Sequence, residues 1–185
     1  MEFMSKDEST TFVTGLARNI NLMDYHTLQD KDKSRVTYEY PLAQDLFQFS
    51  FGIAEDAIVN NWAFLFITDQ WIFPSAENTH LYYSIRRYDG DFRSIGTAPG
   101  HLFLKHEKHD LASYISICIS NCYDCLLLSE MDYSRFHYSH DGFLDVYTIE
   151  SDFLQKMDKL SKRKSWALGS EIQEKPGKHA SKNGV

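Results

Sequence analysis

Three cysteines in the second half of the chain have a spacing at which thiolates can hold an iron–sulfur cluster. They are Cys118, Cys122 and Cys125, and thiolates are the usual ligands of such clusters. Cys118 and Cys122, however, fall on the apolar face of a helix predicted for residues 107–122. A free cysteine on such a face usually packs as a small buried side chain. The sequence therefore predicts three reduced, mostly buried cysteines and no bound metal.

Histidines and one aspartate form a second candidate site. His106 and His109 are three residues apart, so they can share one face of a helix and bind a metal ion together with Asp110. His137 or His140 would have to approach them from another element to complete the site. A small metal- or acid/base-dependent enzyme built on these residues is therefore our alternative hypothesis. The simpler interpretation is that a polar helix start gathers polar residues.

The sequence lacks the common catalytic motifs. Ser139, His140 and Asp141 are neighbours in the chain, whereas the members of a Ser-His-Asp triad converge from separate elements. The glycines do not have the spacing of a phosphate-binding loop, and no Gly-x-Ser-x-Gly elbow occurs. We therefore expect a protein that is not an enzyme and uses no cofactor.

The elements that position these residues are predicted from hydrophobic periodicity and from turn residues. The pattern predicts helices at 10–24, 107–122 and 151–162, and strands at 35–40, 46–51, 62–68, 80–88, 123–129, 135–140 and 143–148. Residues 89–105 are expected to form a loop. Asp141-Gly142 is a strong hairpin signal that requires a positive φ at the glycine. The predicted fold class is α+β, with a mainly antiparallel sheet and two or three packed helices.

The distribution of charge divides the chain into two parts. The net charge of the 185 residues is −7, but the segment from residue 162 onward carries six basic and two acidic groups. The other 161 residues carry 13 basic and 24 acidic groups, a net charge of −11. We therefore expect one domain over residues 1–163 and a basic, flexible tail over 164–185.

An acidic domain repels nucleic acid and anionic membranes and attracts basic proteins. The first residues do not have the layout of a signal peptide. The longest apolar run, at 62–68, is too short to span a bilayer. We therefore expect a cytoplasmic protein that binds neither nucleic acid nor membrane. The sequence leaves the oligomeric state open.

Residues 100–148 show a characteristic order of features: a Gly-His-Leu-Phe segment, an acidic helix start, an amphipathic helix, the segment Tyr-Asp-Cys-Leu-Leu-Leu, and a final Phe-His-Tyr-Ser-His-Asp-Gly. This order resembles small bacterial immunity proteins that are encoded beside polymorphic or contact-dependent toxins. The resemblance implies an acidic α+β domain without catalysis that binds one toxin domain and blocks its active site, which is basic in nuclease toxins. Binding residues differ between such families, so the resemblance assigns none here.

The composition is consistent with a binding protein. Aromatic residues make up 15% of the chain, and there are eleven tyrosines, more than a core readily buries. We expect a non-catalytic protein that binds a basic toxin domain through turns in which acidic and aromatic residues adjoin. The predicted contact residues are Tyr88, Asp89, Asp91, Glu130, Asp132, Tyr133 and Asp141.

Overall fold

The computed structural model describes residues 1–16, 20–29, 32–41, 45–70 and 76–163. Within them the chain forms one antiparallel sheet of seven strands in the order β1-β4-β3-β5-β6-β7-β2. The fold is therefore α+β, as the sequence predicts. The strands are β1 (Glu2–Met4), β2 (Ser34–Glu39), β3 (Trp62–Gln70), β4 (Gly100–Leu104), β5 (Tyr123–Ser129), β6 (Ser134–Tyr138) and β7 (Phe143–Thr148).

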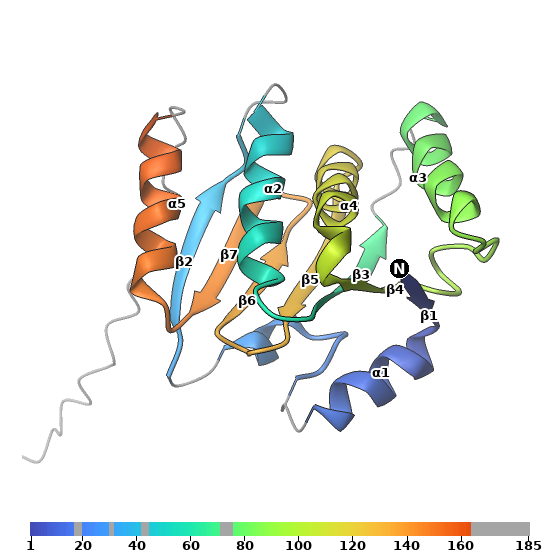
Figure 1. The fold of residues 1–185 in the computed structure, drawn as a ribbon, viewed down its shortest axis with the longest axis horizontal. Helices are drawn as coiled ribbons and strands as arrows, with labels where there is room; N and C mark the ends of the chain where they lie inside the picture. The colour runs from blue at the N-terminus through green and yellow to red at the C-terminus, as the bar shows by residue number, and fades with distance from the viewer. Residues whose placement is uncertain (17–19, 30–31, 42–44, 71–75, 164–185) are drawn as a thin grey trace, which may run out of the picture.

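Helices cover both faces of this sheet. They are α1 (Lys6–Gly15), α2 (Leu46–Ala57), α3 (Ala76–Tyr88), α4 (Lys108–Ser120) and α5 (Ser151–Arg163), with 3-10 turns η1 (Tyr25–Leu28) and η3 (Lys105–Glu107). In Figure 1, α5, α2, α4 and α3 stand side by side in front of the sheet. A smaller core on the other face includes side chains of α1 and of the segment that leads into and through η1.

The central strand β3 is buried on both faces, as its unbroken apolar run predicts. Ala63 and Leu65 belong to the core beneath α2 and α4. Phe64 and Phe66 belong to the core on the α1 side. Such a strand needs no alternation of polar and apolar residues, which is why the run could be assigned correctly. The expected strands at 35–40, 123–129, 135–140 and 143–148 and the helices at 107–122 and 151–162 are also confirmed within a few residues.

Residues 46–51 form the start of α2, so the predicted strand is wrong. The apolar positions in this short window alternate, which favours a strand. Over the whole of α2, however, the buried residues Leu46, Phe49, Ile53 and Ala57 recur at helical spacing. This face packs against α4. The alternation arises because Phe47 is half exposed on the outer face.

The strand predicted at 80–88 is also wrong, because these residues form α3. In the part of α3 whose side chains the structure describes, residues 81–88, Tyr82 and Arg86 are fully buried. Arg86 donates to the Tyr82 hydroxyl at 3.0 Å and to the Ala98 carbonyl at 3.0 Å, and it pairs with Asp91 at 3.3 Å. Tyr82 also contacts Nε2 of the buried His101 at 2.5 Å. An inward-facing arginine does not appear in a hydrophobic pattern, so the helical period was missed.

The N-terminal helix and the loop at 89–105 also differ from expectation. α1 begins after Ser5, whose side chain forms a capping box with Glu8, whereas the helix was expected to start near Ser9 and to run to residue 24. Ser9 is instead buried within α1. The end of the expected loop forms β4, which lies between β1 and β3. The expected tail at 164–185 lies outside the described residues.

The connections between these elements gather at two ends of the sheet. We call the first the loop end: the α2–β3 loop (58–61), the β5–β6 turn (130–133) and the β7–α5 connection (149–150). We call the second the hairpin end: the α4–β5 turn (121–122) and the β6–β7 turn (139–142). None of the helices in the described ranges is long and apolar enough to cross a membrane.

Candidate binding surface

The seven predicted contact residues lie in three separate places. Tyr88, Asp89 and Asp91 lie beside edge strand β1, and the group from 130 to 133 lies at the loop end. Asp141 lies at the hairpin end, at the other end of β6, so it does not adjoin the 130–133 turn as expected. Because β4 and β3 lie between β1 and β5 in the sheet, one small partner surface does not include all seven residues.

The group beside β1 is partly structural. Tyr88 is 92% exposed and Asp89 is also exposed, at the end of α3. Asp91 is buried, where it pairs with Arg86 and accepts two hydrogen bonds from the Arg93 side chain at 3.0 and 2.6 Å. These residues adjoin an open groove, with about 790 Å³ of empty space, whose other wall is β1. Asp91 therefore holds this loop together and is not available as a contact.

Two of the predicted acidic contacts in the β5–β6 turn are also bound within the protein. The Glu130 carboxylate accepts hydrogen bonds from the backbone and side-chain nitrogens of Asn61 at 2.9 and 3.0 Å, which ties the turn to the α2–β3 loop. Asp132 has a positive φ of 55°. Its two carboxylate oxygens accept from Nε and Nη2 of Arg135, both at 2.7 Å. Both acids set the shape of the loop end.

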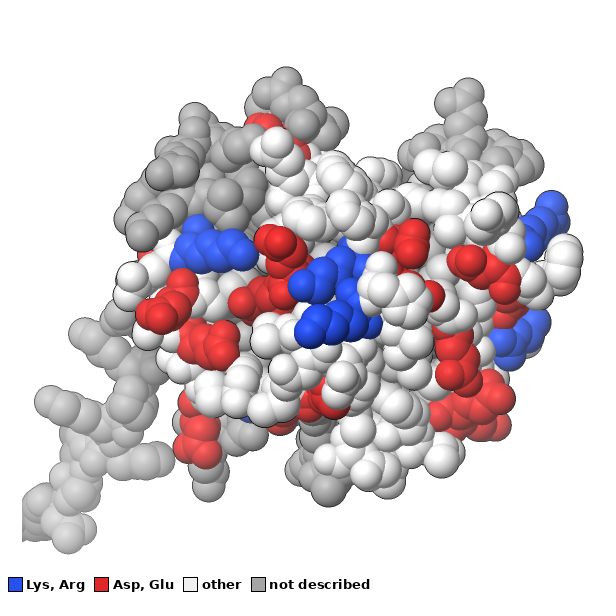
Figure 2. All heavy atoms as spheres, viewed as in Figure 1, with Lys and Arg blue, Asp and Glu red and all other residues white. Residues whose placement is uncertain are grey.

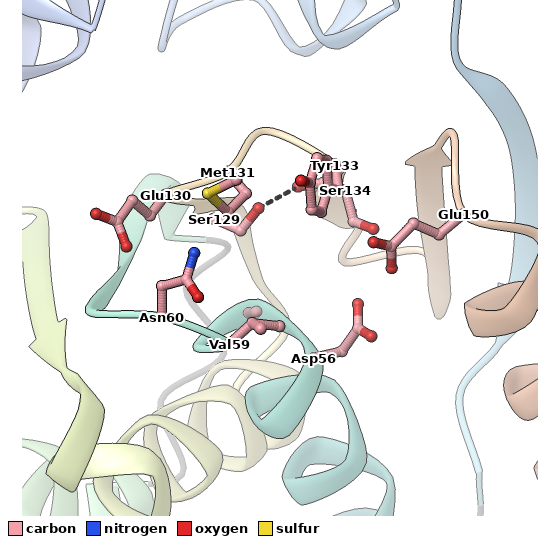
Figure 3. A pocket seen from close by; sticks show the side chains of 10 residues that line it. Asp56, Val59, Asn60, Ser129, Glu130, Met131, Tyr133, Ser134 and Glu150 are labelled. Atoms are coloured by element: carbon pink, nitrogen blue, oxygen red, sulfur yellow. Dashed lines mark hydrogen bonds between the residues drawn. The ribbon is translucent and has the colours of Figure 1, made fainter.

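Tyr133 lies beside a hollow at the loop end that sequence reasoning did not identify (Figure 3). The hollow has about 260 Å³ of empty space, including open solvent, and is formed by the end of α2 and the loop after it, the β5–β6 turn with the strand ends beside it, and the β7–α5 connection. Its floor includes Ser129, whose hydroxyl donates to the Ser134 carbonyl at 3.2 Å. Its enclosed interior has room for about one water molecule.

Two carboxylates line this hollow, Asp56 on α2 and Glu150 in the β7–α5 connection (Figure 3). Burial, together with the nearby charge of Glu150, raises the pKa of Asp56 to about 7, although Lys156 acts in the opposite direction. Within the described part of the chain, no donor forms a hydrogen bond with the Asp56 carboxylate. A partly buried acid without a donor costs folding free energy at neutral pH.

Apolar side chains are exposed around the same hollow. Val59, Met131 and Tyr133 line it, and between 37% and 53% of each is exposed. Ile149, 53% exposed, adjoins them, because its backbone N–H donates to the Tyr133 carbonyl at 3.2 Å. Aromatic and methionine side chains that are grouped on a surface are typical of protein interfaces. The loop end thus combines exposed apolar groups with carboxylates.

The hairpin end is different, because its partly buried acid, Asp124, is bound within the protein. Asp124 accepts from the backbone N–H of His140 at 2.6 Å, and both its oxygens are 2.9 Å from Nδ1 of the same residue. Asp141 is exposed, 3.4 Å from Nε2 of His140. Gly142 has a φ of +91°, which confirms the predicted turn.

The histidines of the alternative hypothesis are dispersed over the fold. His109 stacks on Phe51 of α2 in the helix layer, with ring centroids 4.9 Å apart. His137 lies on the opposite face of the sheet, stacked on Tyr25 at 4.2 Å. His140 lies at the hairpin end, whereas His109 lies at the start of α4, after β4 has reached the loop end. In the described ranges no three His, Cys, Asp or Glu side chains are arranged to hold a metal ion.

His137 adjoins a polar cluster that the sequence did not suggest. Asp145 accepts from Arg35 at 3.3 and 3.0 Å and from the Thr37 hydroxyl at 2.6 Å. Burial alone would raise its pKa, but the nearby imidazole of His137, 3.6 Å away, and the hydrogen bonds from Thr37 and Arg35 lower the pKa of Asp145 to about 2. One sequence feature could have indicated this cluster. In the alternating pattern of β7, Asp145 follows the apolar Leu144, so its side chain must point away from the helix layer.

The three cysteines do not share one environment. Cys118 on α4 and Cys125 on β5 are fully buried in the main core, as predicted. Cys122 is exposed, which corrects the prediction that it lies on the buried helix face. The reason is that α4 ends at Ser120, and Cys122 turns the chain with a φ of +54°.

The charged groups visible on the helix-covered face are mixed. Figure 2 shows Asp and Glu side chains spread over this face, with Lys and Arg side chains between them. The net negative charge of the domain therefore does not form one continuous acidic surface on this side. Local arrangement, as at the loop end, has to define any contact.

Comparison with known proteins gives no family or relative. No family model matches the chain, and no curated protein and no solved structure matches it.

Proposed function

We propose that this protein is a non-catalytic binding protein that docks its loop end onto a basic protein domain, in the manner of a cytoplasmic immunity protein on its toxin. The observation that carries the proposal is the ring of exposed apolar side chains around the Asp56 and Glu150 carboxylates. Apolar anchors exclude water from a contact, and acids within it select a positively charged partner.

The charge of the partner follows from the two carboxylates. A lysine or arginine side chain of a partner would supply the donors that Asp56 lacks and would lower its pKa. An acidic partner would bring a further acid to a site that already holds two carboxyl groups. The net charge of −11 on residues 1–161 also favours a basic partner at longer range, because it speeds the approach of a positively charged domain.

The contact would centre on Tyr133. Tyrosine presents a large ring and a hydroxyl at a low entropic cost, and it is enriched among residues that dominate interface energies. Glu130 and Asp132 would act indirectly, by holding the turn that carries Tyr133. This proposal retains Tyr133 among the predicted contacts and adds Asp56, Val59 and Glu150.

The test compares variants with an equal change of charge at the two ends of the sheet. Glu150→Lys acts at the loop end, and Asp141→Lys acts at the exposed hairpin tip. Partners are captured from the native host on each variant, and their affinities are then measured with purified components. Thermal melting confirms that each variant is folded.

We expect a basic protein that binds wild type and Asp141→Lys within about threefold, and Glu150→Lys at least tenfold more weakly. Tyr133→Ala should increase the dissociation rate by a similar factor. An acidic partner or a nucleic acid, or equal losses in both lysine variants, would contradict the proposal.

A further inference from the structure

The two edge strands of the sheet differ in whether their outward backbone groups are hydrogen-bonded. β1 has three residues, and the carbonyl of Phe3 accepts a hydrogen bond from the Arg93 side chain at 2.7 Å. That side chain blocks the edge against another strand. β2, at the other edge, has six residues, and it pairs only with β7 among the described strands.

Two hydrogen bonds determine which backbone groups of β2 point outward. Ser139 N donates to Phe143 O at 2.8 Å, so the backbone N–H and C=O groups of Phe143 point toward β6. Those of the next residue, Leu144, therefore point toward β2. Tyr40 N donates to Gly142 O at 3.0 Å, so Tyr40 faces β7. The direction of the backbone groups alternates along an antiparallel strand. The N–H and C=O groups of Tyr38, Val36 and Ser34 therefore also point toward β7.

The backbone N–H and C=O groups of Arg35, Thr37 and Glu39 therefore point away from the sheet. Within the described part of the chain these groups have no hydrogen-bond partner on that side. The side chains of Arg35 and Glu39 are exposed as well. An edge with three free residues in register is a template for another strand.

The sequence of β2 is complementary to itself. When two copies pair antiparallel about a twofold axis at Thr37, Arg35 of one copy lies opposite Glu39 of the other, and all three outward residues form hydrogen-bonded pairs. Opposite charges across such a pair stabilise it, and like charges destabilise it. An axis at Arg35 or at Glu39 would place like charges opposite each other. The Thr37-centred register is therefore favoured by both the backbone and the charges.

We propose that two copies of this chain associate through β2, antiparallel and centred on Thr37, so that one sheet runs through both. The interface is isologous, since the same strand serves both copies. It leaves the loop end free, so the proposed partner contact and this association are independent. Arg35 keeps its bond to Asp145 while its exposed side faces Glu39 of the second copy.

The test uses charge reversals at the two edges. Glu39→Arg places like charges opposite each other across the proposed interface, and Glu2→Arg makes the same change on β1. Thr37→Pro removes an outward N–H that forms no bond within the sheet, so it blocks pairing with another strand. Sedimentation equilibrium is measured for each folded variant at concentrations up to roughly 1 mM, a range that detects weak edge-strand dimers.

We expect a reversible dimer for wild type and Glu2→Arg, a dissociation constant at least about tenfold higher for Glu39→Arg, and a monomer for Thr37→Pro. A wild-type protein that stays monomeric would overturn the proposal. So would a dimer that Glu39→Arg and Thr37→Pro leave unchanged, since it would form through another surface.

Discussion

The loop end and the hairpin end of the sheet both carry carboxylates, but they use them differently. At the hairpin end, Asp124 is bound by the backbone N–H and the imidazole of His140, and the turn above it is tight. At the loop end, Glu130 and Asp132 are bound in the same way, whereas Asp56 has no hydrogen-bond donor among the described residues. Four exposed apolar side chains (Val59, Met131, Tyr133 and Ile149) gather near Asp56, whereas Phe143 is the exposed large apolar side chain among the described residues at the hairpin end.

This difference separates acids that stabilise the fold from acids available to a partner. A carboxylate that accepts several hydrogen bonds is already satisfied, and removing it leaves its donors unpaired. A partly buried carboxylate without a donor reduces stability at neutral pH and gains the most from a new cation. The comparison therefore assigns structure to the hairpin end and recognition to the loop end.

The largest effect is expected at the hairpin end. Asp124→Ala removes the acceptor of the His140 backbone N–H and imidazole, and we expect it to lower the free energy of unfolding by about 2–3 kcal/mol. Urea denaturation measures this loss. Glu150→Ala at the loop end is the matched control, and we expect it to change the free energy of unfolding by less than about 0.5 kcal/mol. Equal losses would mean that the two ends do not differ as described.

Asp56→Asn should have a smaller effect of opposite sign that depends on pH. The pKa of Asp56 is raised from its ordinary value of 3.8 to about 7. Between these values the folded protein holds a proton that the unfolded chain has released, so stability falls as the pH rises through this window. The asparagine does not titrate. We expect the variant to be more stable than wild type at pH 8 by on the order of 1 kcal/mol, after allowance for partial solvent screening.

At pH 4 most of this advantage should be lost, because Asp56 is then protonated in the folded protein and partly protonated in the unfolded chain. Thermal melts across the pH range, with Asp141→Asn as the exposed control, provide the comparison. If Asp56→Asn lowered stability at pH 8, the carboxylate would have a stabilising partner and the proposed role of the loop end would be weakened.

Gly142→Val should cost about 1–2 kcal/mol at the hairpin end. The glycine has a φ of +91°, and a side-chain carbon built on it meets no atom within 4 Å, so the cost is backbone strain alone. Asp141→Ala in the same turn should change the melting temperature much less. An unaltered melting temperature in Gly142→Val would show that the turn relaxes without strain.

The hairpin turn and the contact residue Tyr133 could be predicted from the sequence, but the hollow lined by Asp56 and Glu150 could not. Asp141-Gly142 predicted the hairpin because turn chemistry is local. Tyr133 was identified because acidic and aromatic residues adjoin in its turn. Residues 46–51 were assigned to a strand, so α2, whose last turn carries Asp56, was not predicted as one helix. Asp56 and Glu150 line one hollow because the fold brings the end of α2 close to the β7–α5 connection, which no local pattern encodes.

The most direct test of the central claim is an amide hydrogen-exchange map of this protein bound to its captured partner. We expect slower exchange on binding at residues 57–61, 130–134 and 148–150, with no change at 139–142. The groove at 88–93 should also be unchanged. Protection confined to the hairpin end or to that groove would contradict the assignment of recognition to the loop end.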